Sequence, residues 1–255
     1  MKGTHPEKIL AVRPVLTKFY EYIADFRDVG RAREIFNFCN SLPSARLEVG
    51  TGKDKPGHDT VLLGPSQAYM PSSGPIPEFL ILELKEIERR YQQPFNSLQI
   101  NRHYDQDSVV HPHHDAQQGH IAIMSLGAER PYILRHEKDE KTMTVNRYKA
   151  GDILFHEALV HGSLLTLFPG TQFEITHEMP KSDVPCGVRI SLIFRYLCEA
   201  MSRKLYGRDV EMANRKELRR EIARFREQNG LGTGVLRQPG AGVRRLCRTE
   251  NRFKT

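Results

Sequence analysis

The sequence predicts an α+β, mainly β protein. Its expected core is a double-stranded β-helix (jelly roll), with N-terminal supporting helices and a basic C-terminal helix and tail. Short β-branched and aromatic runs fill residues 95–197, helical periodicities precede them, and a basic helical pattern follows. At 255 residues the chain fits one main domain over about residues 1–200, because single β-rich domains reach roughly 200–250 residues.

Two helical patterns and a turn-rich segment precede the strands. Residues 14–41 repeat apolar side chains at three- and four-residue intervals, which predicts a helix. Between about residues 43 and 77, glycine, proline and serine break any long element, so we expect short strands and turns there. We interpret this segment as a lid. Residues 76–92 return to a helical period that ends near Tyr91 and predicts a second supporting helix.

The strand region contains eight short runs separated by turn residues. These runs are SLQINRHY, IAIMSLG, PYILRHE, TMTVNRY, DILFHEALV, GSLLTL, TQFEITHEM and RISLIFRYL. Many short strands at regular spacing imply a sandwich or a barrel. A jelly roll is the version that hosts metal sites in its mouth, so we expect the core over about residues 95–197 to have this form.

The positive charge of the chain is concentrated at its end. The net charge is +7, but residues 201–255 hold 15 basic and 6 acidic residues, a net charge of +9. This extension contains an amphipathic helix with Leu218, Ile222 and Phe225 on one stripe, followed by a glycine-rich tail from Gly230. Concentrated positive charge attracts polyanions, which makes nucleic acid the expected partner class; the alternative is a merely solvated tail.

The cysteines and the first residues bear on the compartment. Four cysteines form no CxxC pair and show none of the close spacing of zinc ribbons or disulfide scaffolds, which favours a reducing compartment. The opening MKGTHPEKIL has no continuous apolar stretch, so we expect neither a signal peptide nor a membrane span. The expected location is the nucleus or the cytoplasm, without a membrane partner.

A histidine-rich segment, HPHHDAQQGH, predicts part of a metal site. Residues i and i+2 of a strand share a face, so His113 and Asp115 point the same way while His114 points to the other side. A distant histidine would complete two imidazole nitrogens and one carboxylate on one face of iron(II), the facial triad of non-haem oxygenases.

The segment ITHEMPKSDVPCGVRISLIFR supplies the distant histidine and two arginines. His177 is followed by Arg189 and then by Arg195, six residues further along one strand, so both arginines share a face. A guanidinium binds a carboxylate through two parallel hydrogen bonds, and 2-oxoglutarate carries a carboxylate at each end. Two arginines beside the metal are therefore the expected receptor for this cosubstrate.

A rival metal site in HEALVH does not have the required spacing. Zinc-protease helices place two histidines four residues apart, whereas His156 and His161 are five apart and diverge around a helix. We expect both histidines to be structural.

Six motifs occur in an order that resembles the AlkB family of nucleic-acid oxygenases: FNSLQINRHY, HHD, IAIMSLG, HGSLL, THEMP and RISLIFR. The similarity covers about residues 95–197, with a weaker likeness in LTKFYEYIADFRDVGRAREIF. The resemblance implies a dioxygenase domain that uses iron(II), 2-oxoglutarate and O2. It implies the iron ligands His113, Asp115 and His177, and it implies 2-oxoglutarate contacts from Asn101, Arg189 and Arg195.

The chain departs from the family at three positions. The family has Asn-x-Tyr before the metal strand, whereas this chain has Asn101-Arg102-His103-Tyr104. Either Tyr104 bulges into the cosubstrate site or His103 replaces the tyrosine, and we favour Tyr104. Gln117 stands where members that repair cationic methylated bases commonly have a carboxylate, and Ser191 stands where the family often has asparagine.

The resemblance implies oxidative demethylation of N-alkylated bases in DNA or RNA, in which decarboxylation of 2-oxoglutarate is coupled to hydroxylation of an N-methyl group. A base in a duplex has to be flipped out, so we expect the lid, with Tyr69 as a stacking residue, and Gln117 to contact the substrate. Two alternatives are a 2-oxoglutarate-dependent hydroxylase of a protein or small molecule, and a nucleic-acid-binding module with an inactive site.

Overall fold

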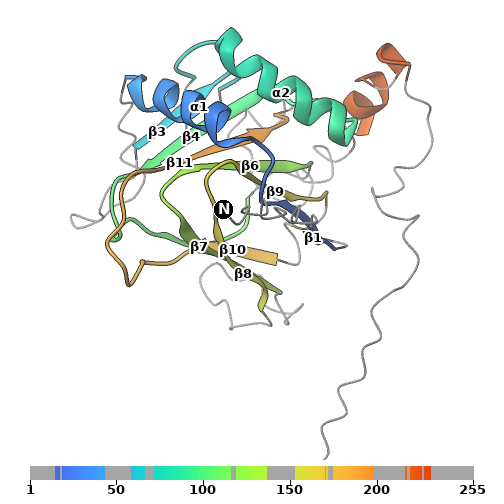
Figure 1. The fold of residues 1–255 in the computed structure, drawn as a ribbon. Coiled ribbons are helices and arrows are strands. Elements are labelled where there is room, and N and C mark those ends of the chain that lie inside the picture. Colours follow the sequence, from blue (N-terminus) through green and yellow to red (C-terminus); the bar gives the residue numbers. More distant parts are fainter. Residues whose placement is uncertain are drawn as a thin grey trace, which may run out of the picture.

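Two antiparallel sheets face each other in the computed structural model of the chain (Figure 1). The structure describes residues 15–17, 19–43, 59–66, 72–115, 119–136, 153–169, 171, 175–197, 216, 219–225 and 227–230. The expected strand TMTVNRY, most of the expected lid, and the tail after Gly230 lie outside these residues.

The larger sheet has seven strands and the smaller sheet has four. The order in the larger sheet is β1 (Val15–Leu16), β2 (Tyr20–Ile23), β9 (Ser163–Leu167), β6 (Ile121–Gly127), β11 (Arg189–Arg195), β4 (Ser97–His103) and β3 (Asp59–Leu63). The order in the smaller sheet is β5 (Val110–His113), β10 (Ile175–Met179), β7 (Arg130–His136) and β8 (Ile153–Leu159). The strands from β4 onward divide equally between the sheets, which confirms the jelly-roll core.

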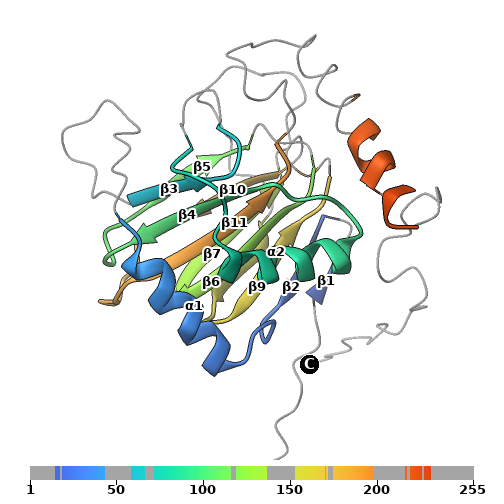
Figure 2. The same ribbon diagram turned by 90° about the horizontal axis from the view of Figure 1, so that it is seen from above.

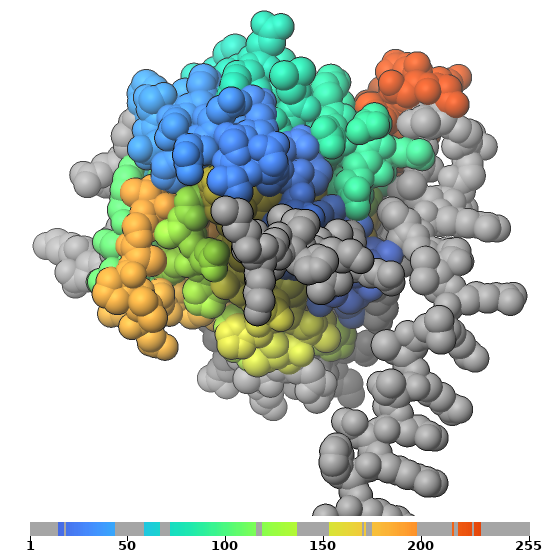
Figure 3. All heavy atoms as spheres, viewed as in Figure 1, coloured from blue at the N-terminus to red at the C-terminus, as the bar shows by residue number. Residues whose placement is uncertain are grey.

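Helices α1 (Val29–Ser41) and α2 (Glu78–Tyr91) cover the outer face of the larger sheet (Figures 1 and 2). The Asp28 side chain caps α1 by accepting a hydrogen bond from the Arg31 backbone N–H. In α2, buried residues recur at helical spacing and pack into the core: Leu80, Leu84, Ile87 and Tyr91. The space-filling view shows the two helices forming one side of the molecule (Figure 3), so the predicted supporting helices are confirmed.

The helix expected over residues 14–41 is wrong in its first part. Residues 15–16 and 20–23 form β1 and β2, and the helix begins only at Val29. β2 pairs with β9 and is buried along its whole length. At four residues, β2 is too short for its Tyr20-Glu21-Tyr22 alternation to outweigh the helical spacing of the apolar residues around it.

Strand alternation separates core-forming from site-forming side chains on β11. Ile190, Leu192 and Phe194 point outward and belong to the apolar cluster beneath the helices. The intervening residues point toward the smaller sheet, and among them are Arg189 and Arg195. Both arginines are therefore held on a rigid strand between the two sheets.

The C-terminal extension is described only in part. Residues 219–225 are helical and lie beside the two-sheet core rather than within it (Figures 1 and 2). Ile222 and Phe225 of the expected stripe are half-buried, whereas Leu218 lies outside the described residues. Among the described residues, no helix combines the length and the apolar character needed to span a membrane.

Candidate iron and 2-oxoglutarate site

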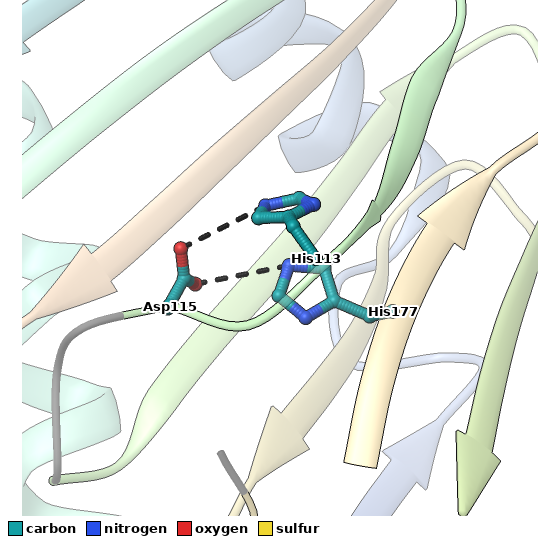
Figure 4. Close-up of side chains that lie close together, drawn as sticks. All are labelled: His113, Asp115 and His177. Carbon is teal, nitrogen blue, oxygen red and sulfur yellow. Dashed lines mark ion pairs between the residues drawn. The ribbon is translucent and has the colours of Figure 1, made fainter. Parts of the chain in front are cut away.

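Two neighbouring strands of the smaller sheet bring the three predicted metal ligands together. His113 ends β5 and lies directly opposite His177 of β10, and Asp115 follows in the loop after β5. The candidate ligand atoms of the three residues lie within 4.8 Å of one another. Figure 4 shows the Asp115 carboxylate facing both imidazole rings. The distance from each histidine Nε2 to the nearer carboxylate oxygen is 3.8 Å.

Hydrogen bonding and burial leave both imidazoles able to donate a lone pair to a metal. His113 Nδ1 donates to the carbonyl oxygen of His111 at 2.8 Å, so the lone pair is at Nε2, which faces Asp115. Burial lowers the pKa of His177 to about 3, so this ring is neutral at neutral pH. Its buried Nδ1 has no hydrogen-bond partner among the described residues.

The third ligand is a carboxylate that keeps its negative charge. Burial by itself would raise the pKa of Asp115, but the Arg195 guanidinium and the neighbouring histidines outweigh this effect and lower it below the usual value. Arg195 Nη2 donates to Asp115 Oδ2 at 3.1 Å. Two neutral nitrogens and one carboxylate are the donor set that suits iron(II), so the side chains present fit the expected metal.

The two arginines are buried, but their partners differ. Arg195 is held by Asp115 and by Gln99 Oε1, which accepts from Nη1 at 3.0 Å. Arg189 is 2% exposed, and its single hydrogen bond within the described structure goes to the Ser125 hydroxyl at 2.9 Å. Burial lowers the pKa of Arg189 to about 10, so it remains charged at neutral pH.

This arrangement leaves a surplus of buried positive charge. Asp115 offsets one arginine, whereas no carboxylate of the described chain lies within salt-bridge distance of Arg189. A buried cation without a counter-ion is costly, and a dianionic ligand beside the metal would remove that cost. The region between the sheets is therefore suited to an anion such as 2-oxoglutarate.

Asn101 lies on the same inner face. Its carbonyl oxygen Oδ1 accepts hydrogen bonds from Thr60 Oγ1 and from Gln99 Nε2, both at 2.9 Å. These two bonds orient the amide, and its Nδ2 donor makes no hydrogen bond within the described chain. Gln99, which the sequence analysis did not single out, therefore orients both Asn101 and Arg195. Strand alternation from Asn101 could have identified it.

The position of Tyr104 does not match the role expected for it. Along β4, residues 98, 100 and 102 point toward the helices, and Arg102 forms a buried ion pair there with Asp59. The Tyr104 hydroxyl donates to Asp59 Oδ2 at 3.1 Å, and its side chain is 45% exposed. Tyr104 thus lies toward the helix side of the sheet, because successive side chains of a strand point to opposite faces.

His103 takes the opposite position. It is 1% exposed, shares strand parity with Asn101, and pairs directly with Arg189 across the β4–β11 ladder. His103, the alternative to Tyr104, therefore lies on the face of the larger sheet that carries Arg189 and Arg195.

Among the described residues, His114, His156 and His161 lie outside the candidate ligand set. His114 Nδ1 donates to the carbonyl oxygen of Ile175 at 3.0 Å, His161 Nδ1 accepts from the Gly127 backbone N–H, and His156 is exposed on β8. Residues 156–161 form a strand and a turn rather than a helix. The two residues expected to contact substrate, Tyr69 and Gln117, lie outside the described residues.

Tyr132 of β7 is a further residue of the site that the sequence analysis missed. Its ring stacks on His177 with 6.0 Å between the ring centroids and 16° between the planes. Burial and then the charge of Asp115 raise the pKa of Tyr132, whereas Arg189 and Arg195 act in the opposite direction. No local sequence pattern predicts this position, because Tyr132 approaches the arginines only when β7 of one sheet packs against β11 of the other.

Comparison with curated proteins supports the resemblance. The chain is 32% identical over 117 residues to the DNA oxidative demethylase ALKBH2 of Arabidopsis thaliana, which covers 40% of this chain and 37% of that protein. It is 32% identical over 108 residues to the human protein of the same name, covering 40% of each chain. The match thus spans about two fifths of the length of these relatives. No family model matches the chain.

Two solved structures match the chain at lower sequence identity. The structure of OsALKBH1 is 15% identical with a TM-score of 0.48, covering 71% of this chain and 100% of that chain. An oxidoreductase of the 2OG-Fe(II) oxygenase family from Burkholderia pseudomallei is 13% identical with a TM-score of 0.46, covering 69% of this chain and 84% of that chain.

Proposed function

We propose that this chain, which resembles the AlkB family, is an iron(II)- and 2-oxoglutarate-dependent dioxygenase that removes N-alkyl groups from bases in DNA or RNA. One observation carries the proposal. A His-Asp-His triad and two buried arginines, one of them without a carboxylate partner in the described chain, converge between the same two sheets. The names of the curated relatives favour DNA as the nucleic acid.

Two groups of residues would bind the metal and the cosubstrate. His113, Asp115 and His177 would hold iron(II), and Arg189, Arg195 and Asn101 would hold 2-oxoglutarate. When bound, the metal, the cosubstrate and O2 supply oxidation of a C–H bond, with 2-oxoglutarate converted to succinate and CO2. An N-methyl group becomes N-hydroxymethyl, which loses formaldehyde and leaves N–H on the base.

The protein's own contribution is orientation and exclusion of water. Gln99 holds the Arg195 guanidinium, and the His111 carbonyl keeps the lone pair of His113 on Nε2. A buried apolar cluster between the sheets includes Ile193 and Met179, together with Tyr132 beside His177, and would help to exclude water from the site. A target base would have to leave its stack to reach this depth.

A nucleic-acid substrate places the proposed activity in the nucleus or the cytoplasm. Within the described residues, Cys39 and Cys186 form no disulfide.

Mass spectrometry of a panel of methylated DNA and RNA oligonucleotides tests the proposal. Each oligonucleotide is incubated with the full chain, iron(II), ascorbate and 2-oxoglutarate. We expect loss of a methyl group and one formaldehyde per succinate with the wild-type protein and with the His156→Ala control, and neither with Asp115→Ala. Succinate formation stimulated by a protein or small molecule, with every oligonucleotide unchanged, would overturn the demethylase assignment.

A further inference from the structure

The C-terminal helix, which occupies the described residues between 216 and 228, has two unlike faces. Residues four apart lie on the same side of a helix. One side of this helix carries a row of exposed basic residues, which we call the basic stripe: Lys216, Arg220 and Arg224. Ile222 and Phe225 lie on the opposite side and are half-buried. The fold therefore covers the apolar face and leaves the basic stripe to solvent.

The acidic residues of this helix leave a positive surplus. Residues 216–230 contain five basic and three acidic residues. Arg224 forms an ion pair with Glu221, one turn earlier on the helix. The other two members of the basic stripe form no ion pair with a carboxylate of the described residues. Two exposed cations of the stripe are therefore available to an external anion.

A second element extends this positive surface. In both ribbon views the C-terminal helix lies beside the C-terminal end of α2 (Figures 1 and 2). The last turn of α2 carries Arg89, which is 82% exposed and forms a loose ion pair with Glu86 at 3.9 Å. Its neighbour Arg90 instead pairs with the buried Glu21. Arg89 and the basic stripe thus place positive charge from two elements at one corner of the molecule.

This corner lies at the end of the larger sheet where the candidate site is found. The C-terminal helix lies beyond the carboxyl end of β11 in both views (Figures 1 and 2). Arg195 is the last residue of β11, and it donates to the candidate metal ligand Asp115. Nucleic acid bound at this corner would therefore be held at the same end of the sheets as the metal.

We propose that the basic stripe, together with Arg89, binds the phosphate backbone of the nucleic-acid substrate. This rests on the proposed function. Four helical residues rise about 6 Å, so the stripe presents its charges at regular intervals along one line, which suits a chain of phosphates better than a single small anion. Phosphate contacts position a nucleic acid without reading its bases. The stripe therefore strengthens binding and leaves the choice of base to the site between the sheets.

Fluorescence anisotropy of a labelled, unmodified DNA duplex tests the proposal without metal, cosubstrate or turnover. Lys216→Gln/Arg220→Gln removes two charges of the stripe from the full chain and keeps good helix formers at both positions. Each lost phosphate contact should flatten the slope of log K against log salt by about 0.9, which at about 0.1 M salt is about an eightfold loss of affinity. The tail after Gly230 is present in every protein compared, so its contribution cancels.

Arg33→Gln/Lys181→Gln is the matched control. Both side chains are exposed, one on α1 and the other just after β10, and the two substitutions lower the net charge by the same amount. The control should therefore keep the affinity and the salt slope of the wild type. Equal affinity and slope in the stripe variant and the wild type overturn the inference. Equal losses in the two variants overturn it as well, because binding would then follow net charge rather than one surface.

Competition with the wild-type protein tests the chemical class of the partner and does not depend on any variant's folding. Poly-L-glutamate offers a chain of carboxylates in place of phosphates, and we expect it to displace the labelled duplex poorly at equal charge concentration. Displacement as strong as that by unlabelled DNA overturns the assignment to nucleic acid.

Kinetics with a methylated oligonucleotide separate this inference from the proposed function. The stripe variant should have a raised KM for the oligonucleotide and an unchanged kcat, because the stripe touches no reacting atom. A lowered kcat with an unchanged KM contradicts binding of the backbone by the stripe. A wild-type protein that binds the duplex through the stripe but demethylates no oligonucleotide overturns the proposed function and leaves the stripe as a nucleic-acid-binding surface.

Discussion

Replacing Asp115 with alanine should destabilise the metal-free protein in addition to abolishing turnover. Among the described residues, Asp115 is the carboxylate that pairs with Arg195, and both side chains are largely buried, at 13% and 7% exposure. The substitution therefore removes a metal ligand and also leaves a guanidinium without its counter-ion between the sheets.

The size of the effect follows from the geometry. At the observed separation of 3.1 Å and an effective dielectric constant of about 20, the charge–charge attraction is about 5 kcal/mol. Removing one partner of a buried ion pair typically costs about 3–5 kcal/mol. For a chain of this size, such a loss lowers Tm by roughly 6–10 °C.

Thermal unfolding in excess EDTA measures this loss without any contribution from metal. Asp115→Ala should unfold at the lower temperature, and Asp115→Ala/Arg195→Met should recover most of the difference while remaining inactive, because a methionine of similar length needs no counter-ion. Equal Tm values for Asp115→Ala and the wild type would refute the ion pair. A double variant as unstable as the single one would do so too.

Three further outcomes follow from other parts of the chain. Burial raises the pKa of Cys39 to about 12, so iodoacetamide at pH 8 should label Cys186 and spare Cys39 in the native protein. Peptide mass spectrometry measures the labelling, and comparable labelling of both cysteines would contradict this prediction. Gly127→Ala should lower the free energy of chemical unfolding by more than about 1–3 kcal/mol. The φ angle of Gly127 is +81°, and an added Cβ would lie 2.3 Å from the carbonyl oxygen of Val188. Gly187→Ala, with open space around it, is the control; equal stabilities of the two variants refute the steric argument. Deleting residues 230–255 should weaken oligonucleotide binding and flatten its salt dependence, at about −0.9 in slope per lost phosphate contact, without changing base preference. An unchanged salt dependence of binding would contradict the expected contribution of the basic tail to nucleic-acid binding.

Local periodicity was sufficient to predict which side chains come together in the candidate metal site. Side chains two residues apart share a strand face, so His113 and Asp115 could be paired and His114 rejected. The even spacing of Arg189 and Arg195 placed both arginines on one face in the same way. Each of these expectations depends on a single strand and its immediate continuation, and the structure brings all the residues to the same inter-sheet region.

Three features could not be predicted from the local sequence pattern. β2 is only four residues long, so its Tyr20-Glu21-Tyr22 alternation is too short to identify a strand. The face occupied by Tyr104 depends on the register of β4, and a shift of one residue would have reversed the prediction. Tyr132 reaches the site only through the packing of one sheet on the other, which local spacing does not encode.

The dependence of 2-oxoglutarate binding on iron(II) tests the site most directly. Anaerobic equilibrium dialysis of the full chain measures bound metal and bound 2-oxoglutarate together. The wild-type protein should bind one iron(II) and, only when the metal is present, one tightly held 2-oxoglutarate. His177→Ala should lose both, and His156→Ala should lose neither. Retention of metal-dependent 2-oxoglutarate binding in His177→Ala would contradict the assignment of the triad.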